Sequence, residues 1–342
     1  MSEFRVNSIT NQDGSAGPQV CGVSTFSGKS GVQIPSGPTD FRRRDGGRRG
    51  RGLFAGGETP RLNVIEKIEI ATTGNATDFG DLVETATNIG GAGNDIRGIF
   101  FAGETPSLVN TIQFVVMSSQ GGSNDFGGTL SFGKIGHNGA VANSTRAVTA
   151  GGYTDPGYSS KIEFVTIAST GDADNFGDLL IPKYAMGSFS SPTRGVFCGG
   201  DPGTSPNTTD DIDFIEIATL GNALDFGDLI TPRLNAGGAA SQTRGLVMGG
   251  RDIPSGGTDN AEYVTIASKG NAILFGSLIG SSSKCTAVSN SIRGVEGGGG
   301  TSANDMCYVY ISTLGTAVDF GDLTTSRASL GSACDAHGGL AQ

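Results

Sequence analysis

The sequence predicts an all-β fold, a six-bladed β-propeller with four-stranded blades. Two motifs support this prediction, because each recurs six times at intervals of about 45 to 50 residues, a spacing typical of propeller repeats. The first is an arginine that opens an apolar run ending in glycine, as in RGLVMGG, and the second is Phe-Gly followed closely by Leu, as in FGDL. The arginines are Arg51, Arg97, Arg146, Arg194, Arg244 and Arg293, and the phenylalanines are Phe79, Phe126, Phe176, Phe226, Phe275 and Phe320.

Each repeat contains four predicted strands, which we name a, b, c and d in chain order. Strand b is the run that the arginine opens, strand d contains the Phe-Gly motif, and strand a follows that motif. Strand c is predicted from apolar residues at alternate positions, such as Ile215 and Ile217, since a period of two is typical of a strand with one buried face. A glycine-containing turn such as TLGNAL then predicts a hairpin between c and d.

The two ends of the repeat region predict how the ring closes. The region begins at Arg51 with a strand b that has no strand a before it, and it ends with RASLGSACDA, a strand a that no strand b follows. A ring of blades must close or leave sheet edges exposed. We therefore expect the C-terminal strand to complete the first blade.

Repeat length varies mainly between strands b and c, where the connection ranges from about 10 to 15 residues, as surface loops allow. Such loops commonly carry binding residues, because a rigid scaffold positions them. The candidate binding residues are Tyr153, Asp155, Tyr158, Asp201, Asn207, Asp210, Arg251, Asp252 and Asp259.

The repeat resembles the kelch repeat in its apolar strand ending in Gly-Gly, its alternating strand, its turn, its aromatic residue and pairs such as Pro232-Arg233. The resemblance covers roughly residues 51–340 and differs in using Phe where kelch blades place Tyr and Trp. It implies a kelch-like propeller.

Composition indicates a folded chain with many tight turns. The 342 residues include 58 glycines, 36% are hydrophobic and only 16% are charged, which argues against intrinsic disorder. The whole chain has a net charge of -10, with an acidic repeat region and basic residues 1–50, so nucleic acid is not expected as the main partner. No signal peptide or membrane span is predicted. The five cysteines form no CxxC pair, so reduced thiols are expected.

Two repeated charged motifs are expected to be structural. The acids of the FGDL motif, such as Asp178 and Asp228, are expected to bind turn amides, with calcium binding as the alternative. The arginines that open strand b are expected to pair with these acids within or between blades. The alternative is a ring of six arginines that binds an anion at one mouth of the channel.

The sequence predicts no enzyme, no cofactor and no metal site. Catalysis would require a local departure from the repeat that supplies an acid, a base or a nucleophile. Only two histidines occur, His137 and His337, in unrelated blades, and the copper ligands of galactose-oxidase-like kelch enzymes have no counterparts. A pair of acids for glycoside hydrolysis stays open as an alternative.

Residues 1–47 are predicted to form an extended attachment arm, and residues 48–342 to form the propeller. The arm is too short to build its own core and contains short alternating apolar stretches, so we expect it to become ordered on a partner. Its basic run FRRRDGGRRGRG is expected to dock on the body or on an acidic partner, with RNA binding or a solvated linker as alternatives. The candidate attachment residues are Phe4, Val6, Ile9, Val20, Val23, Phe26, Arg42, Arg43 and Arg44.

The segment VNSITNQDGSAGPQVCGVSTFSGKSGVQIPSGPTD resembles the N-terminal attachment segments of virion proteins of marine tailed phages, especially cyanophages. The resemblance implies a non-enzymatic structural protein of the virion, in the tail or a fibre, that is synthesised in the host cytoplasm. Its partners would be other virion proteins, further copies of itself in the particle, and a host-surface glycan or protein. The alternatives are a cellular kelch-type interaction scaffold and a glycan-active enzyme.

Overall fold

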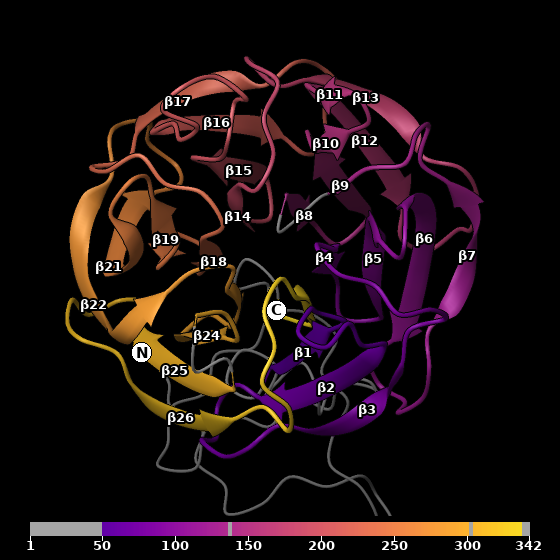
Figure 1. Ribbon diagram of the computed structural model, residues 1–342, viewed down its shortest axis with the longest axis horizontal. Coiled ribbons are helices and arrows are strands. Elements are labelled where there is room, and N and C mark those ends of the chain that lie inside the picture. The colour runs from indigo at the N-terminus through magenta and orange to yellow at the C-terminus, as the bar shows by residue number, and fades with distance from the viewer. Residues whose placement is uncertain (1–49, 136–138, 301–303, 337–342) are drawn as a thin grey trace, which may run out of the picture. The chain divides into compact units, whose positions relative to one another are not determined.

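The computed structural model describes residues 50–135, 139–300 and 304–336. Six antiparallel sheets surround a central axis and form a six-bladed β-propeller, as Figure 1 shows. The predicted fold class is confirmed, and the described residues contain no helix. The chain divides into two units, Met1–Phe41 and Arg42–Gln342, and the predicted domain boundary after residue 47 lies outside the described residues.

Strands a to d run from the centre of the ring to its rim in each blade. Blade 1 contains β27 (Gly331–Cys334), β1 (Arg51–Ala55), β2 (Val64–Glu69) and β3 (Thr77–Asp81). Blade 2 contains β4 (Gly90–Gly93), β5 (Arg97–Glu104), β6 (Leu108–Val116) and β7 (Asn124–Thr129). Blade 3 contains β8 (Ala140–Ala142), β9 (Arg146–Ala150), β12 (Lys161–Thr166) and β13 (Asp174–Asp178). Blade 4 contains β14 (Gly187–Ser190), β15 (Arg194–Cys198), β16 (Asp211–Glu216) and β17 (Leu224–Asp228). Blade 5 contains β18 (Gly237–Ala240), β19 (Arg244–Met248), β21 (Gly256–Thr265) and β22 (Ile273–Ser282). Blade 6 contains β23 (Thr286–Ser289), β24 (Arg293–Gly297), β25 (Asp305–Tyr310) and β26 (Val318–Asp322).

The first blade is assembled from distant parts of the chain. β27 pairs antiparallel with β1, with Gly52 opposite Cys334 and Ala55 opposite Gly331. On its other side β1 pairs with β2, so β27 takes the place of the missing strand a. This arrangement confirms the predicted closure of the ring by the C-terminal strand.

Most of the core lies between neighbouring blades. Phe226 of β17 is buried in a cluster with Leu229 of the connection that follows it and with Val247 and Val264 of blade 5. Its ring meets Phe214 of strand c edge-on, with the centroids 5.8 Å apart. All six motif phenylalanines are buried, and burying one such ring stabilises the fold by about 1.5–3 kcal/mol. These rings therefore help to hold neighbouring blades together.

The glycine of the Phe-Gly motif lets adjacent blades approach closely at the rim. Gly227 has a φ of 145°, and a Cβ on it would lie 2.6 Å from the carbonyl carbon of Gly270 in the c-to-d turn of blade 5. The Gly270 amide donates to the Phe226 carbonyl oxygen over 2.8 Å, and the Asp228 amide donates to the Asn271 side chain over 3.2 Å. Glycine is therefore required here because main chain packs on main chain.

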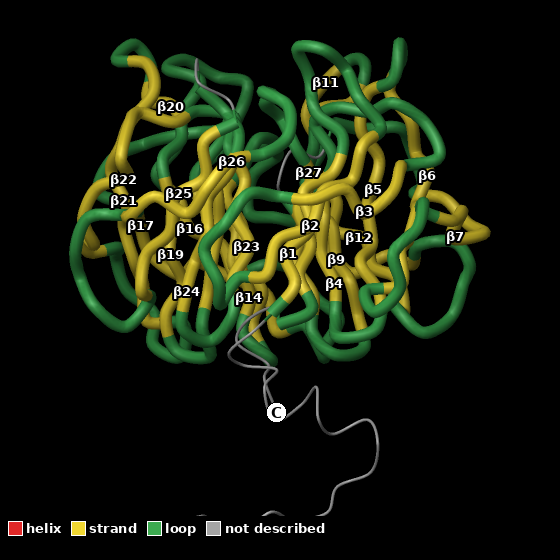
Figure 2. Tube along the Cα trace, turned by 90° about the horizontal axis from the view of Figure 1, so that it is seen from below, coloured by secondary structure: helices red, strands yellow, loops and turns green. Residues whose placement is uncertain are grey.

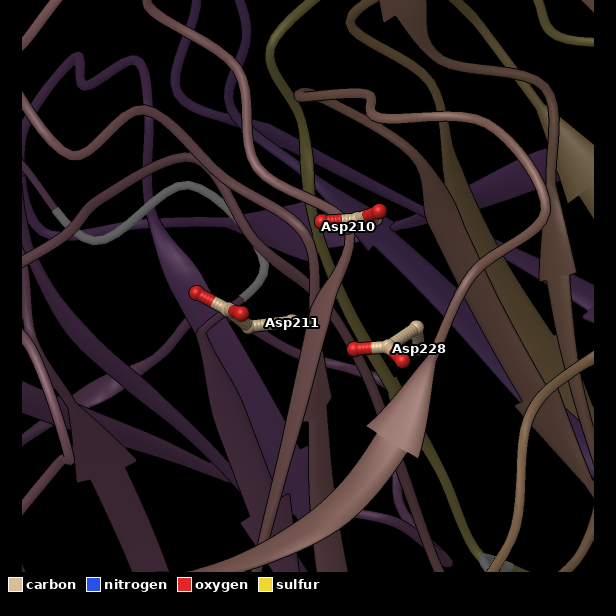
Figure 3. A group of neighbouring side chains, drawn as sticks. All are labelled: Asp210, Asp211 and Asp228. Atoms are coloured by element: carbon tan, nitrogen blue, oxygen red, sulfur yellow. The ribbon is translucent and has the colours of Figure 1, made fainter.

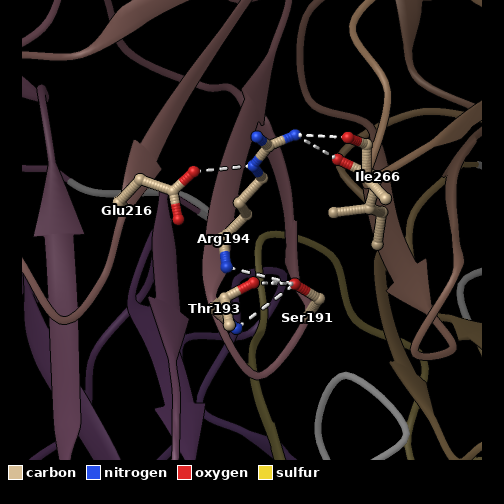
Figure 4. Close-up of polar contacts among 6 residues, drawn as sticks. Ser191, Thr193, Arg194, Glu216 and Ile266 are labelled. Carbon is tan, nitrogen blue, oxygen red and sulfur yellow. Dashed lines mark hydrogen bonds and ion pairs between the residues drawn. The ribbon is translucent and has the colours of Figure 1, made fainter.

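The arginine that opens strand b fastens its blade to the next one. Arg194 Nη1 donates to the carbonyl oxygens of Ile266 and Ala267 in blade 5 over 2.8 and 3.0 Å, and its Nε donates to Glu216 of its own blade (Figure 4). The other five arginines each donate to a carbonyl at the end of strand c in the next blade, at Met117, Ile167, Ile217, Ile311 and Ile70.

The predicted pairing of these arginines with the FGDL acids is wrong. Strand c separates the two groups along its length: Arg194 lies opposite Glu216 at the end of β16, whereas Asp228 lies opposite Asp211 at its beginning. The arginines are structural, as expected, but their acceptors between blades are main-chain carbonyls.

The two faces of the ring carry different connections, as the edge-on view in Figure 2 shows. One face, which we name the turn face, carries the a-to-b and c-to-d turns. Gly50 lies there, because its carbonyl oxygen accepts from the Ile70 amide just after β2, and a Cβ on Gly50 would lie 3.5 Å from the Cβ of Ala336, just after β27. The opposite face, named the loop face, carries the b-to-c connections. Two of these form short hairpins, β10 (Tyr153–Thr154) with β11 (Gly157–Tyr158) and β20 (Arg251–Asp252) with β21.

Candidate functional site

The innermost strands surround a channel lined by small side chains. Glycine, alanine and serine predominate where β4, β8, β14, β18, β23 and β27 face the axis. Ser188 Oγ donates to the Ala140 carbonyl oxygen and Ser190 Oγ to that of Ala142, each over 2.8 Å. The described lining residues include no Asp, Glu, His, Lys or Arg. The hydroxyl groups of the channel therefore serve to join neighbouring blades.

Three tyrosine side chains meet on the loop face. This tyrosine cluster consists of Tyr153 in β10, Tyr158 in β11 and Tyr184 in the connection that leads into blade 4. The ring centroids lie 5.6 Å apart for Tyr153 and Tyr158, 5.5 Å for Tyr158 and Tyr184, and 6.1 Å for Tyr153 and Tyr184. All three rings are half-buried, so part of each faces solvent. Tyr153 and Tyr158 are paired residues of the short hairpin, which fixes their contact.

A buried carboxylate lies beside the tyrosine cluster. Asp201 is only 7% exposed, and its main chain exchanges two hydrogen bonds with that of Tyr184, of 2.8 and 3.1 Å. Burial and then the negative charge of Asp201 raise the pKa of both Tyr158 and Tyr184. Asp201 Oδ1 accepts from the Gly203 amide over 2.7 Å, which holds the carboxylate in place. The rings therefore lie in a negative local field.

The structure brings together three of the predicted binding residues, namely Tyr153, Tyr158 and Asp201. Tyr184 was not among the predicted binding residues. Those residues were chosen from the b-to-c connections, which vary in length, whereas Tyr184 lies in a d-to-a connection of nearly constant length. A signal was present in the repeat, since the equivalent bridged positions of other blades carry Thr87, Ile135, Leu234 and Ala328. A tyrosine at a position that has no aromatic residue in those blades marks a local departure from the repeat.

The other predicted loop residues do not join this cluster in any contact described. Asp155 and Asn207 are exposed in their loops. Arg251 and Asp252 form β20 and pair with Gly257 and Gly256. Asp259 lies within β21, so its assignment to a loop is wrong: strand c of blade 5 begins early because its first residues also pair with β20 and β22.

Several sequence-based predictions concern residues outside the described ranges. These include all nine candidate attachment residues of the arm, both histidines and Cys21. The remaining cysteines, Cys198, Cys285, Cys307 and Cys334, are buried thiols that form no disulfide, as predicted.

Three aspartates gather at the loop-face end of blade 4, as Figure 3 shows. Asp210 and Asp211 lie where β16 begins, Asp228 ends β17, and one oxygen of each lies within 4.8 Å of the others. In blade 3 the corresponding FGDL acid, Asp178, accepts from the Ser160 hydroxyl over 3.1 Å instead of from a turn amide. Three carboxylate groups that are all charged at this separation would repel one another.

Four blades contain a buried ion pair that sequence reasoning did not predict. In blade 5 the Arg233 guanidinium donates to the Glu262 carboxylate, and each side chain is 1% exposed. Glu262 also accepts from the Ile230 amide over 2.9 Å, which connects strand c to the end of the preceding blade. The other pairs are Arg327 with Glu66, Lys134 with Glu163 and Lys183 with Asp213.

The residues at the two positions of this ion pair change together between blades. The two blades without the pair carry Ala86 with Gln113 in blade 2 and Ser282 with Cys307 in blade 6. Since the basic and the acidic residue are replaced in the same blades, the ion pair behaves as one unit. This joint change is the sequence signal that could have revealed the ion pair. The pair Pro232-Arg233, which was attributed to the kelch pattern, contains the basic residue of the ion pair in blade 5.

Blade 6 buries a different carboxylate, which is bound by neutral groups. Glu296 of β24 accepts from the Ser282 hydroxyl over 2.6 Å and from the Cys307 thiol over 3.4 Å. Burial raises the pKa of Glu296 to about 7, since the charged form is poorly solvated there.

No protein-family model matches this sequence, and no curated protein is similar to it. The structure alone therefore defines the class, a six-bladed β-propeller with a tyrosine cluster and a buried carboxylate on its loop face. Among the described residues, no helix is long and apolar enough to cross a membrane.

Proposed function

We propose that this chain is a non-enzymatic structural component of a tailed-phage virion, in the tail or a fibre. Its N-terminal arm attaches it to other virion proteins, and its propeller presents the loop face to a host-surface ligand or to a neighbouring subunit. The observation that carries this proposal is the arrangement of the faces, because the chain enters the ring at Gly50 on the turn face and the b-to-c connections lie on the other.

This arrangement supports the proposed separation of attachment from binding. The described chain begins at Gly50 on the turn face, opposite the face that carries the b-to-c connections. The blades are joined at the rim, through the strand-b arginines and by buried hydrophobic clusters, so the ring is a rigid support for its loops. Rigid scaffolds with variable loops are typical of binding proteins.

The channel lining supports a role in binding rather than catalysis. Its described residues are mainly glycine, alanine and serine, and their hydroxyls bond to neighbouring strands. The partly exposed tyrosines lie on the loop face instead, and tyrosine is enriched where proteins bind their partners.

Deletion of residues 1–41 tests the proposal. We expect particles assembled with the shortened chain to lack it, while the shortened chain still unfolds cooperatively with the melting temperature of the full chain. A matched control carries Asp155→Ala and Asn207→Ala on the loop face, and it should be incorporated normally. Normal incorporation of the shortened chain would contradict attachment by the arm. Absence of the full chain from purified particles, together with a soluble partner that the shortened chain retains, would favour a cellular scaffold instead.

A further inference from the structure

We propose that the tyrosine cluster and Asp201 form a binding site for an alkylated ammonium group, such as the trimethylammonium group of choline. The proposal rests on the proposed function in taking the loop face as the ligand-binding face, and it adds the chemistry of the ligand. It combines three observations: the geometry of the rings, the buried carboxylate beside them, and the departure of these positions from the repeat.

The geometry suits a single cation. Each pair of ring centroids in the cluster lies 5.5 to 6.1 Å apart, so one cation on the solvent side can lie within about 6 Å of all three centroids. Cations are attracted to the negative faces of aromatic rings within that distance, and groups of aromatic rings are a known way of binding quaternary ammonium ions.

The charge of the site favours a cation over a neutral or anionic ligand. The Asp201 carboxylate is buried beside the rings, and the pKa of Tyr158 and of Tyr184 is raised by burial and then by that charge. The same field that disfavours a tyrosinate favours a positive ligand. An alkylated ammonium also sheds water more easily than a small ion, which suits half-buried rings.

The site has a structural support that points to a defined shape. Gly203 has a φ of 73°, and a Cβ there would overlap the ring of Tyr158. Its amide holds the Asp201 carboxylate. One glycine therefore positions both the ring and the charge, and three of the six tyrosines of the chain are gathered at this one place.

Tyrosine fluorescence of the full chain provides the test, because the chain contains no tryptophan. Choline chloride is titrated against its uncharged carbon analogue, in which a tert-butyl group replaces the trimethylammonium group. We expect saturable binding of choline and at least about fivefold weaker binding of the analogue. Equal binding of the two, a signal from neutral methyl glycosides alone, or no saturable signal would overturn the proposal.

Variants locate the site. Tyr158→Ala and Asp201→Asn should each weaken choline binding by about three- to tenfold, whereas Tyr158→Phe, which keeps the ring, should change it by less than about threefold. The matched control is Tyr310→Ala, since Tyr310 is an exposed tyrosine of blade 6. Unchanged binding by Tyr158→Ala, with the fold verified by thermal unfolding, would overturn the assignment.

Two further probes distinguish the source of the ammonium group. Retention on phosphatidylcholine vesicles assigns it to a lipid head group, and retention on a trimethyl-lysine peptide assigns it to a protein. The binding test is independent of particle assembly. If deletion of the arm abolishes incorporation but the full chain does not bind choline, the proposed function stands and only the proposed ligand is overturned.

Discussion

Gly321 of the last blade lies against Gly74 of the first, so that a Cβ on Gly321 would come within 2.6 Å of the Gly74 main chain. This contact closes the ring at its rim, and the Gly74 amide donates to the Phe320 carbonyl oxygen across it over 2.7 Å. An equivalent pair of glycines, Gly227 and Gly270, lies where blade 4 meets blade 5. The contact that closes the ring is therefore of the same kind as the contact between two consecutive blades.

Gly321→Ala should therefore destabilise the protein by at least about 2 kcal/mol, because the methyl group meets main chain that cannot move aside and φ is 135°. Thermal or denaturant unfolding measures the change. Gly280→Ala is the matched control, since a Cβ at Gly280 meets nothing within 4 Å, and it should change stability by less than about 0.5 kcal/mol. Equal stability of the two variants would show that the blades do not depend on this close approach.

Arg233→Met should destabilise the protein by about 3–5 kcal/mol, because Glu262 would be left charged and buried. Glu262→Gln should also destabilise it, while the double variant should be more stable than the sum of the two predicts, by about 1–3 kcal/mol. The control is Lys284→Met, whose partner Glu58 is partly exposed, so its effect should be about 1 kcal/mol or less. Strict additivity at Arg233 and Glu262 would contradict the view of the pair as one unit.

Glu296 should make the stability of the fold depend on pH. Its pKa of about 7 in the folded protein exceeds the ordinary value of 4.5, so the folded state binds the proton more tightly than the unfolded state. The resulting stabilisation is fully present below about pH 4.5 and is lost as the pH rises to about 7. Asp335, whose pKa burial raises to about 6, contributes with the same sign.

Glu296→Gln isolates the first of these groups. The stability of the variant relative to the natural protein should rise by on the order of 3 kcal/mol between pH 4.5 and pH 7.5, measured by urea unfolding. A difference in stability that stays constant across this range would show that Glu296 titrates normally.

Asp228→Asn should stabilise the protein at neutral pH by on the order of 1 kcal/mol, because it removes one of three neighbouring negative charges. Asp178→Asn in blade 3 is the matched control, since its carboxylate accepts from Ser160 and the change should be neutral or destabilising. Destabilisation by Asp228→Asn would show that the three carboxylates are held together by favourable contacts.

The blades could be predicted from the sequence because six copies of one pattern average out local ambiguity. Ile215 and Ile217, two apolar residues at alternate positions, are both buried as expected, and so is every phenylalanine of the Phe-Gly motif. Closure by β27 followed from counting strands at the two ends of the repeat, which needs no knowledge of packing.

The partners of the side chains were harder to predict. The acceptors of Arg194 in blade 5 are the carbonyl oxygens of Ile266 and Ala267. Every residue has a main-chain carbonyl, so the residue type at these positions does not indicate the hydrogen bond. The contact between Tyr158 and Tyr184 joins two blades, and only the folded ring brings them together. By contrast, the buried pair of Arg233 and Glu262 did leave a trace, because blades 2 and 6 lack both charges.

The pairing of β27 with β1 has a consequence for how the protein is made. β27 is synthesised after all the other described strands, and until it emerges from the ribosome, β1 lacks its inner neighbour and blade 1 cannot be completed. Blades 2 to 6 can each form from contiguous chain as they emerge, so the emergence of β27 converts an open arc into a closed ring. Nascent chains stalled before Gly331 should therefore be far more sensitive to proteases than chains that include β27.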